Sequence, residues 1–277
     1  NQEQIAYKMV FEKKYHQFKD YAQPRIVGVK VNLDIFPKEL NFKLNASYTM
    51  VNKTKEAIDS IFIMHKGYPI TFSFDRGHRL VSNDSLFQFQ IYRLDKALKP
   101  GDSLQLGFKI QNIKNTALRT NSPVLSNGTY LKSSALFPRL GYKQSNLKNN
   151  VLRKTNGLEP YIEKSHPSDS TALGNHLISR DSDWITFEAT VSTSEDQIAI
   201  APGSLQKEWT VNGRHYYNYK VDGKMLNLFS FNSGRFEVKK ETWNDVDLEI
   251  YYHKGHETNL DRMLAGMKAS LAYNTKN

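Results

Sequence analysis

Residues 29–54 read V-K-V-N-L-D-I-F-P-K-E-L-N-F-K-L-N-A-S-Y-T-M-V-N-K-T, and apolar side chains recur there at every second position. This is the period of a β-strand that buries one face. Pro37-Lys38-Glu39 interrupts the alternation between two apolar runs, as a turn does. The stretch predicts a long β-hairpin. Its inward residues would be Val27, Val29, Val31, Leu33 and Ile35 before the turn, and Phe42, Leu44, Ala46, Tyr48 and Met50 after it.

Strand patterns and turn signals continue through most of the chain. Pro100-Gly101-Asp102, Asn212-Gly213 and Asp222-Gly223 each separate two apolar runs and are strong turn signals. No alternation of strands with helices appears, which argues against a parallel sheet. We expect an all-β fold, an antiparallel saddle-like or sandwich-like domain over residues 24–252. Further strands are predicted at residues 58–64, 70–74, 86–92, 104–110, 184–191, 198–200, 209–221, 226–231, 236–238 and 246–252.

A helical pattern opens the chain. Aromatic and apolar residues recur at spacings of three and four until Pro24 ends the run, so residues 1–23 are predicted to be a helical connector. The helix could pack against the β domain or, being basic, lie on a membrane surface. The recurring residues are Tyr7, Val10 or Phe11, Tyr15, Phe18 and Tyr21.

A second helix is predicted near the end of the chain, where Thr258 is a candidate N-cap. Residues 253–277 would be a linker and the first helix leading to a catalytic domain that this sequence does not contain. The apolar stripe of the helix could dock that domain or pack on this chain's own sheet. Its residues, the domain-docking candidates, are Leu260, Met263, Leu264, Met267 and Leu271.

Composition excludes several classes of protein. The 277 residues are 39% hydrophobic and include no cysteine, so a folded core is expected, without disulfides or thiolate metal sites. The formal net charge is +10, but the basic residues are scattered and the densest clusters are only pairs such as Lys239-Lys240. A nucleic-acid partner is therefore not expected, because phosphate contacts require a basic stripe. No apolar run approaches the ~18 residues that span a bilayer.

The hairpin of residues 29–54, ending in V-N-K-T, resembles the opening of the amino-terminal domain of zinc aminopeptidases of the aminopeptidase N and leukotriene hydrolase family. Ile58-Asp59-Ser60-Ile61, residues 98–104 and the helix at residues 259–273 extend the resemblance over nearly the whole chain. In particular, the sequence is similar to a bacterial, Bacteroidetes-like branch in which the peptidase follows an ABC-transporter-permease-like membrane region. The resemblance implies a membrane-associated parent protein with its soluble part outside the cytoplasm, while this fragment itself would be soluble.

The family's catalytic motifs can be sought residue by residue. Zinc is held there by H-E-x-x-H and a later Glu, and a G-x-M-E-N strand receives the substrate's amine. The only His-Glu pair here is His256-Glu257, and Leu260 stands where the second His would be. The nearest string to the second motif, residues 265–269, has Lys268 in place of Glu. The chain is therefore expected to be non-catalytic and to hold no cofactor, with zinc in the missing catalytic domain.

His253, His256 and Glu257 could form a weak metal site on a loop, although such residues are more often surface or capping groups. We expect no metal here.

The resemblance also implies a loop that reaches the substrate cleft. The corresponding residues, our substrate-cleft candidates, are Asn127, Gly128, Thr129 and Tyr130, which would approach a peptide through backbone polar groups. The alternative, that Asn127-Gly128 is simply a tight turn, is the commoner role of such a pair. The usual F-P-x-x-D-E-P ending is absent, because Gly141-Tyr142 stands where D-E would be.

The resulting interpretation is a β domain that shapes the cleft of a zinc metallo-aminopeptidase and docks its catalytic domain. Its partners would be that domain, the peptide substrate and an upstream membrane region. The alternative is a free-standing β-sandwich module that binds glycan or protein ligands, because aromatic side chains on a sheet can stack on sugars. The candidates for such stacking are Trp209, Tyr216, Tyr217, Tyr219 and Trp243.

Overall fold

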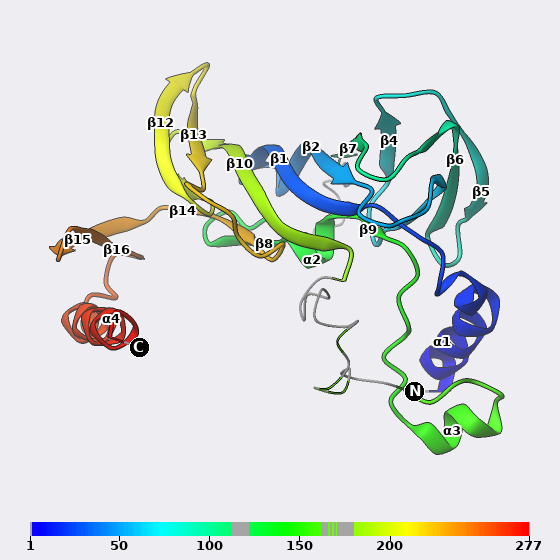
Figure 1. Cartoon of the computed structure of the whole chain (residues 1–277). Coiled ribbons are helices and arrows are strands. Elements are labelled where there is room, and N and C mark those ends of the chain that lie inside the picture. Colours follow the sequence, from blue (N-terminus) through cyan, green and yellow to red (C-terminus); the bar gives the residue numbers. More distant parts are fainter. Residues whose placement is uncertain are drawn as a thin grey trace.

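A computed structural model describes residues 2–111, 122–161 and 180–276, together with His166, Ser168 and Ser170. The chain is mostly β, with a helix near each end (Figure 1). The predicted all-β fold is confirmed. The strands are β1 (Arg25–Phe36), β2 (Asn41–Val51), β3 (Ile58–Met64), β4 (Ile70–Phe74), β5 (His78–Asp84), β6 (Phe89–Leu98), β7 (Ser103–Gln111), β8 (Thr129–Lys132), β9 (Arg139–Leu140), β10 (Ser182–Ser194), β11 (Ile198–Ile200), β12 (Ser204–Val211), β13 (Arg214–Lys220), β14 (Ser230–Gly234), β15 (Glu237–Trp243) and β16 (Val246–Tyr252). The helices are α1 (Gln2–Tyr15), η1 (His16–Phe18), α2 (Ser133–Leu136), α3 (Asn150–Thr155) and α4 (Leu260–Asn274).

The predicted hairpin is the pair β1 and β2, in which Leu33 lies opposite Leu44. The alternation of apolar residues fixes this register, because a slip by one residue would turn both apolar faces to solvent. The prediction was wrong at Val27, which is only half-buried, whereas Ile26 is buried. A bulge between Ile26 and Gly28 adds a residue to β1 and reverses which side chains point inward before it.

A seven-stranded sheet in the order β12-β13-β10-β1-β2-β7-β4 spans the molecule. Its β1 and β10 are parallel neighbours, whereas its other neighbouring strands are antiparallel. The expectation of purely antiparallel strands was wrong for this pair. A parallel pair needs a long connection, and residues 37–181, which include several other strands, supply it in place of a helix.

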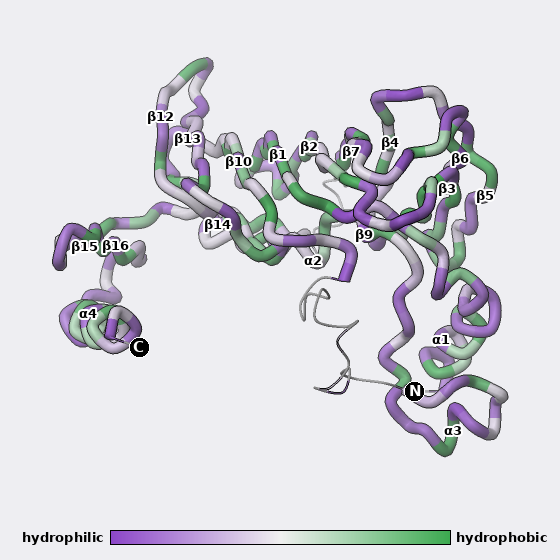
Figure 2. Tube along the Cα trace, in the orientation of Figure 1, coloured by the Kyte–Doolittle hydropathy of each residue, from purple (hydrophilic) through white to green (hydrophobic). Residues whose placement is uncertain are grey.

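The main core lies between the seven-stranded sheet and two smaller sheets, β5-β6-β3-β9 and β11-β14-β8 (Figure 1). Hydropathy alternates along the central strands, with apolar side chains at every second position of β1 and β2 (Figure 2). Residues 61–64 of β3 are all apolar because both faces of the strand are covered there. Ile61 and Ile63 join the main core, whereas Phe62 faces α1 on the other side.

Asn52, in the V-N-K-T end of the hairpin, is buried and joins several segments through hydrogen bonds. Its Nδ2 donates to the carbonyl oxygens of Leu98 at 2.8 Å and Glu56 at 2.7 Å, and its Oδ1 accepts from the Thr54 N–H at 2.9 Å. Its backbone carbonyl accepts from Gly101 N in the Pro-Gly-Asp turn. One side chain thus joins the ends of β2 and β6 and the approach to β3.

Helix α1 packs on the outer side of β3 and β6 through Phe11 and Tyr15, which contact Phe62, Phe87 and Phe89. Of the two alternatives for this helix, packing against the β domain is therefore the one observed. The regular helix ends at Tyr15, earlier than the predicted end at Pro24, and a short 3₁₀ turn follows. No helix within the described part of the chain is long and apolar enough to cross a membrane.

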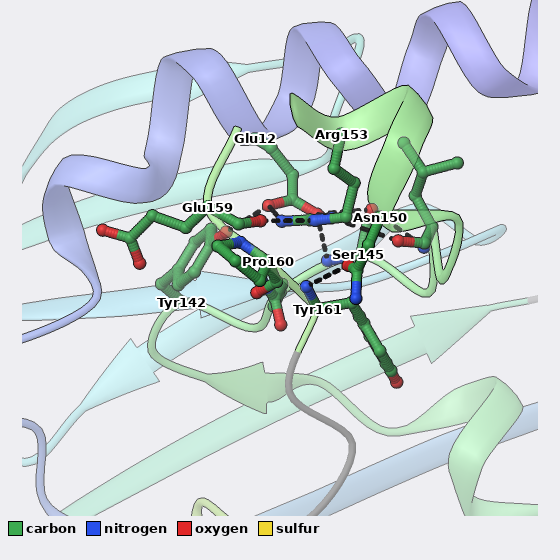
Figure 3. Close-up of polar contacts among 10 residues, drawn as sticks. Glu12, Tyr142, Ser145, Asn150, Arg153, Glu159, Pro160 and Tyr161 are labelled. Atoms are coloured by element: carbon green, nitrogen blue, oxygen red, sulfur yellow. Dashed lines mark hydrogen bonds and ion pairs between the residues drawn. The ribbon is translucent and has the colours of Figure 1, made fainter. Parts of the chain in front are cut away.

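A buried ion pair fastens α1 to the segment that contains α3 (Figure 3). Both carboxylate oxygens of Glu12 accept hydrogen bonds at 2.8 Å from the guanidinium of Arg153. Ser145 and Tyr142 donate to the same carboxylate. Burial by itself raises the pKa of Glu12, but the hydrogen bonds and positive charge around it bring that pKa below its ordinary value. Sequence analysis did not identify this pair.

Helix α4 and the hairpin β15-β16 form a small core of their own, away from the main sheets in Figure 1. Leu260 and Leu264 of α4 are buried there against Leu248 and Ile250 of β16. The predicted cap at Thr258 was wrong, because Asn259 occupies the N-cap position without a side-chain hydrogen bond.

Candidate functional site

The substrate-cleft candidates lie on the loop that leads into β8. Asn127 and Tyr130 are exposed, whereas Thr129 is buried. The Thr129 hydroxyl accepts from the N–H of Leu125 and donates to its carbonyl, both at 3.0 Å, which closes a tight turn. Gly128 has a φ of +82°, a conformation that glycine adopts without strain. The chain therefore presents Ser126, Asn127 and Gly128 at the tip of a closed turn, which we call the 125–130 loop.

Two exposed groups of the 125–130 loop are partly engaged. Asn127 Oδ1 accepts a hydrogen bond of 2.7 Å from the backbone N–H of Arg235. The ring of Tyr130 lies 5.3 Å from the ammonium of Lys132, a cation–π distance. Asn127 thus uses its side-chain carbonyl within the fold, while Tyr130 keeps half of its surface exposed.

A buried polar cluster lies beneath the loop. Gln197, in the turn between β10 and β11, donates from Nε2 to the carbonyl of Ser126 at 2.8 Å. Its Oε1 accepts from the hydroxyl of Ser233 on β14 at 2.7 Å, and Ser233 is in turn 2.6 Å from the hydroxyl of Thr193 on β10. Gln197, Ser233 and Thr193 are almost completely buried. Sequence analysis missed this cluster, because single polar residues in strands and turns carry no spacing signal.

Arg235 holds the loop from the surface. Its Nε donates to the carboxylate of Asp196 at 2.5 Å, and its Nη1 is 3.4 Å from the carbonyl of Ser126. Together with the backbone contact to Asn127, Arg235 joins the β10–β11 turn to the loop.

His253, at the end of β16, lies beside the loop. Its Nε2 is 3.6 Å from the position that a Cβ on Gly128 would occupy, and its ring is 4.9 Å from that of Phe236. The structure therefore brings His253 to the substrate-cleft candidates, a proximity that sequence spacing did not predict.

The residues considered for a metal site do not assemble into one. Glu257 turns its carboxylate to the N–H of Gly255 at 2.8 Å, and His256 contacts His253 through backbone atoms. Within residues 2–111, 122–161 and 180–276, no group of three His, Asp or Glu side chains is placed to hold a metal ion. The described residues thus do not fit a zinc ion.

The domain-docking candidates divide between two environments. Leu260 and Leu264 are buried, and Met267 and Leu271 pack partly against the same small core. Met263 is 51% exposed. The stripe thus covers this chain's own hairpin through most of its length. Lys268 forms an ion pair with Glu241 of β15.

The aromatic residues considered for glycan stacking are largely occupied within the fold. Tyr217 and Tyr219 are buried and donate to the carbonyls of Gln197 and Ala199. Burial raises the pKa of Tyr217 to about 12. Trp209 and Tyr216 are half-buried and stack on each other with ring centroids 5.2 Å apart. Trp243 packs against the small core of α4. Tyr217 and Tyr219 were wrong as stacking candidates.

Solved structures share this architecture. An M1 zinc metallopeptidase from Deinococcus radiodurans matches 89% of the chain with a TM-score of 0.52 at 15% identity. A variant of it bound to a Tyr-Ser-Ala substrate also matches 89%, with a TM-score of 0.51 at 14% identity. The fold is thus shared with M1 zinc metallopeptidases. Legionella pneumophila aminopeptidase A, solved with aspartic acid, matches 94% with a TM-score of 0.58 at 10% identity.

The match covers only part of these proteins. The chain spans 53% of the Deinococcus enzyme and 28% of the Legionella enzyme. Sequence comparison finds no matching family model and no matching curated protein.

Proposed function

We propose that this chain is the non-catalytic amino-terminal β domain of a zinc metallo-aminopeptidase. The supporting observation is that its fold matches M1 metallopeptidases over 89% of the chain while spanning about half of theirs. The sequence contains neither H-E-x-x-H nor G-x-M-E-N, so the hydrolytic chemistry would belong to the rest of the protein.

In this proposal the 125–130 loop forms part of the wall of the substrate cleft. Binding residues are often carried by exposed loops on a rigid scaffold, and this loop is exposed at its tip and held by buried side chains beneath. Tyr130 would contact the peptide with its ring, and Asn127, Gly128 and Thr129 with backbone polar groups.

The catalytic domain would dock beside α4 and the β15-β16 hairpin. The small core there has few residues, and Met263 remains exposed next to it, which favours further contacts from another unit. The resemblance of residues 29–54 to the bacterial, Bacteroidetes-like branch supports two further expectations. The parent would carry an upstream ABC-transporter-permease-like region, and its peptidase part would lie outside the cytoplasm.

Substitution of Tyr130 tests the role in the cleft. In the full-length protein, Tyr130→Ser should raise KM for a tripeptide by about fivefold with kcat within twofold, because a binding contact of ~1 kcal/mol is lost. Tyr21→Ser, also at an exposed tyrosine but beside η1, is the matched control and should change neither constant. Equal KM values for the Tyr130 variant and the parent would remove the loop from the cleft.

A further inference from the structure

The 125–130 loop is exposed at its tip, yet the groups that hold it come from distant parts of the chain. Gln197 follows β10, and Ser233 and Arg235 lie on and just after β14. Exposed turns are usually closed by their own residues, as Thr129 does here. Additional anchors from two other segments therefore need a reason beyond closure of the turn.

We propose that Gln197 is a positioning residue that fixes the 125–130 loop in the orientation needed to receive a peptide, with Arg235 as a second anchor at the surface. This inference rests on the proposed function for the role of the loop. Gln197 acts through the carbonyl of Ser126 and does not touch the substrate.

The geometry of the amide supports this role. Its donor and acceptor ends both have partners, at 2.8 Å to Ser126 and 2.7 Å to Ser233. The buried hydroxyls therefore fix the orientation of the amide. If the amide were reversed, its N–H would face the donating hydroxyl of Ser233 unless the hydroxyls also reorganised. A buried amide held in this way transmits the rigidity of β10 and β14 to the backbone carbonyl of Ser126, an exposed residue.

Arg235 contributes differently because it is exposed. An exposed Arg–Asp pair contributes little to stability because solvent screens it, so the ion pair with Asp196 has little weight for folding. Arg235 instead restrains the position of the loop, because this one residue contacts Asp196, the carbonyl of Ser126 and the side chain of Asn127.

Amide hydrogen exchange in the 277-residue chain tests the positioning directly. Gln197→Met keeps the size of the side chain and removes both polar ends. The N–H groups of Leu125 and Arg235, which bond Thr129 Oγ1 and Asn127 Oδ1, should exchange about tenfold faster relative to amides of the β1–β2 ladder. Arg235→Ala, which spares the buried cluster, should accelerate the Leu125 amide by about threefold, and it keeps the test valid if the Met variant folds poorly.

Two matched controls are available. Gln23 is a half-buried glutamine whose amide also bridges backbone groups, those of Ser60 and Phe62. Gln23→Met should accelerate Phe62 and leave Leu125 unchanged. Arg93, in an exposed pair with Asp59 at 2.8 Å, is the control for Arg235. Unchanged exchange at Leu125 in both Gln197→Met and Arg235→Ala would overturn the inference.

Kinetics of the full-length protein then separate the inference from the proposed function. Gln197→Met should raise KM for a tripeptide by roughly tenfold with kcat within twofold, as expected for a lost positioning contact. Faster exchange accompanied by a raised KM supports both proposals. Faster exchange with an unchanged KM leaves the positioning in place and overturns the role of the loop in the cleft.

Discussion

Replacement of Glu12 by Gln should destabilise the fold far more than its position on a terminal helix suggests. The substitution preserves shape but leaves the Arg153 guanidinium, which is 0% exposed, without a counter-charge. Removing one partner of a buried ion pair costs about 3–5 kcal/mol, because the remaining charge stays desolvated. That is a large share of the ~5–15 kcal/mol that stabilises a typical domain.

Urea denaturation of the 277-residue chain measures this effect. With an m-value of about 3 kcal/mol per molar urea, the midpoint should fall by at least ~1 M. Glu159→Gln is the matched control, since Glu159 lies in the same region and pairs with Lys19 but is 57% exposed. That control should leave the urea midpoint nearly unchanged, because solvent screens an exposed ion pair.

Two further results bear on the same reasoning. The double substitution Glu12→Leu with Arg153→Met removes both charges and should recover much of the loss. Because the folded-state pKa of Glu12 is lowered, its stabilisation is present above the unfolded pKa and is lost as the pH falls through the folded value. A loss below 1 kcal/mol for Glu12→Gln, or an equal loss for Glu159→Gln, would refute the description of this pair as a buried fastening of α1.

Three other predictions concern the frame of the domain. Asn52→Ala leaves the buried Leu98 carbonyl without its donor and should lower the free energy of unfolding, measured in urea, by about 2–4 kcal/mol. Its control, Asn45→Ala at an exposed position of β2, should lower it by under ~0.5 kcal/mol. Gly203→Ala would place a Cβ 2.3 Å from the Lys220 carbonyl oxygen, in a backbone conformation with a φ of +98°. This substitution should lower Tm by more than about 10 °C or prevent folding. Its control, Gly213→Ala, has open space around it and should cost only about 1 kcal/mol. Burial by itself would raise the pKa of Asp84, but hydrogen bonds from Lys14 and Tyr15 bring that pKa to about 2, so Asp84 stabilises the fold above about pH 4 and loses this effect toward pH 2. Acid titration of Asp84→Asn should lack that component.

Strands that bury one face could be predicted from the sequence, because burial imposes a period of two. The β1–β2 hairpin shows this most clearly, and its inward residues were found apart from the shift at the Gly28 bulge. Strand β5 was not predicted. Among the residues that the structure describes it pairs with β6 alone, and its side chains are mostly exposed, so no face of it has to be apolar.

The candidate site could be found only in part. Asn127-Gly128 is visible as a turn signal, but its anchors come from residues about 70 and 108 positions away, Gln197 and Arg235. The pair Glu12 and Arg153 joins residues 141 positions apart. Contacts of this kind depend on tertiary packing and leave no local pattern of residue types. Sequence analysis considered His253 as a metal ligand, whereas the structure places its side chain beside Gly128 of the 125–130 loop.

Zinc content and aminopeptidase activity, measured side by side on this chain and on the full-length protein, test the central claim most directly. We predict that the full-length protein carries zinc and releases amino-terminal residues from fluorogenic aminoacyl substrates. The 277-residue chain should do neither, because its sequence contains no H-E-x-x-H. Zinc-dependent cleavage by the chain alone, or a full-length protein that neither holds zinc nor cleaves these substrates, would contradict the account.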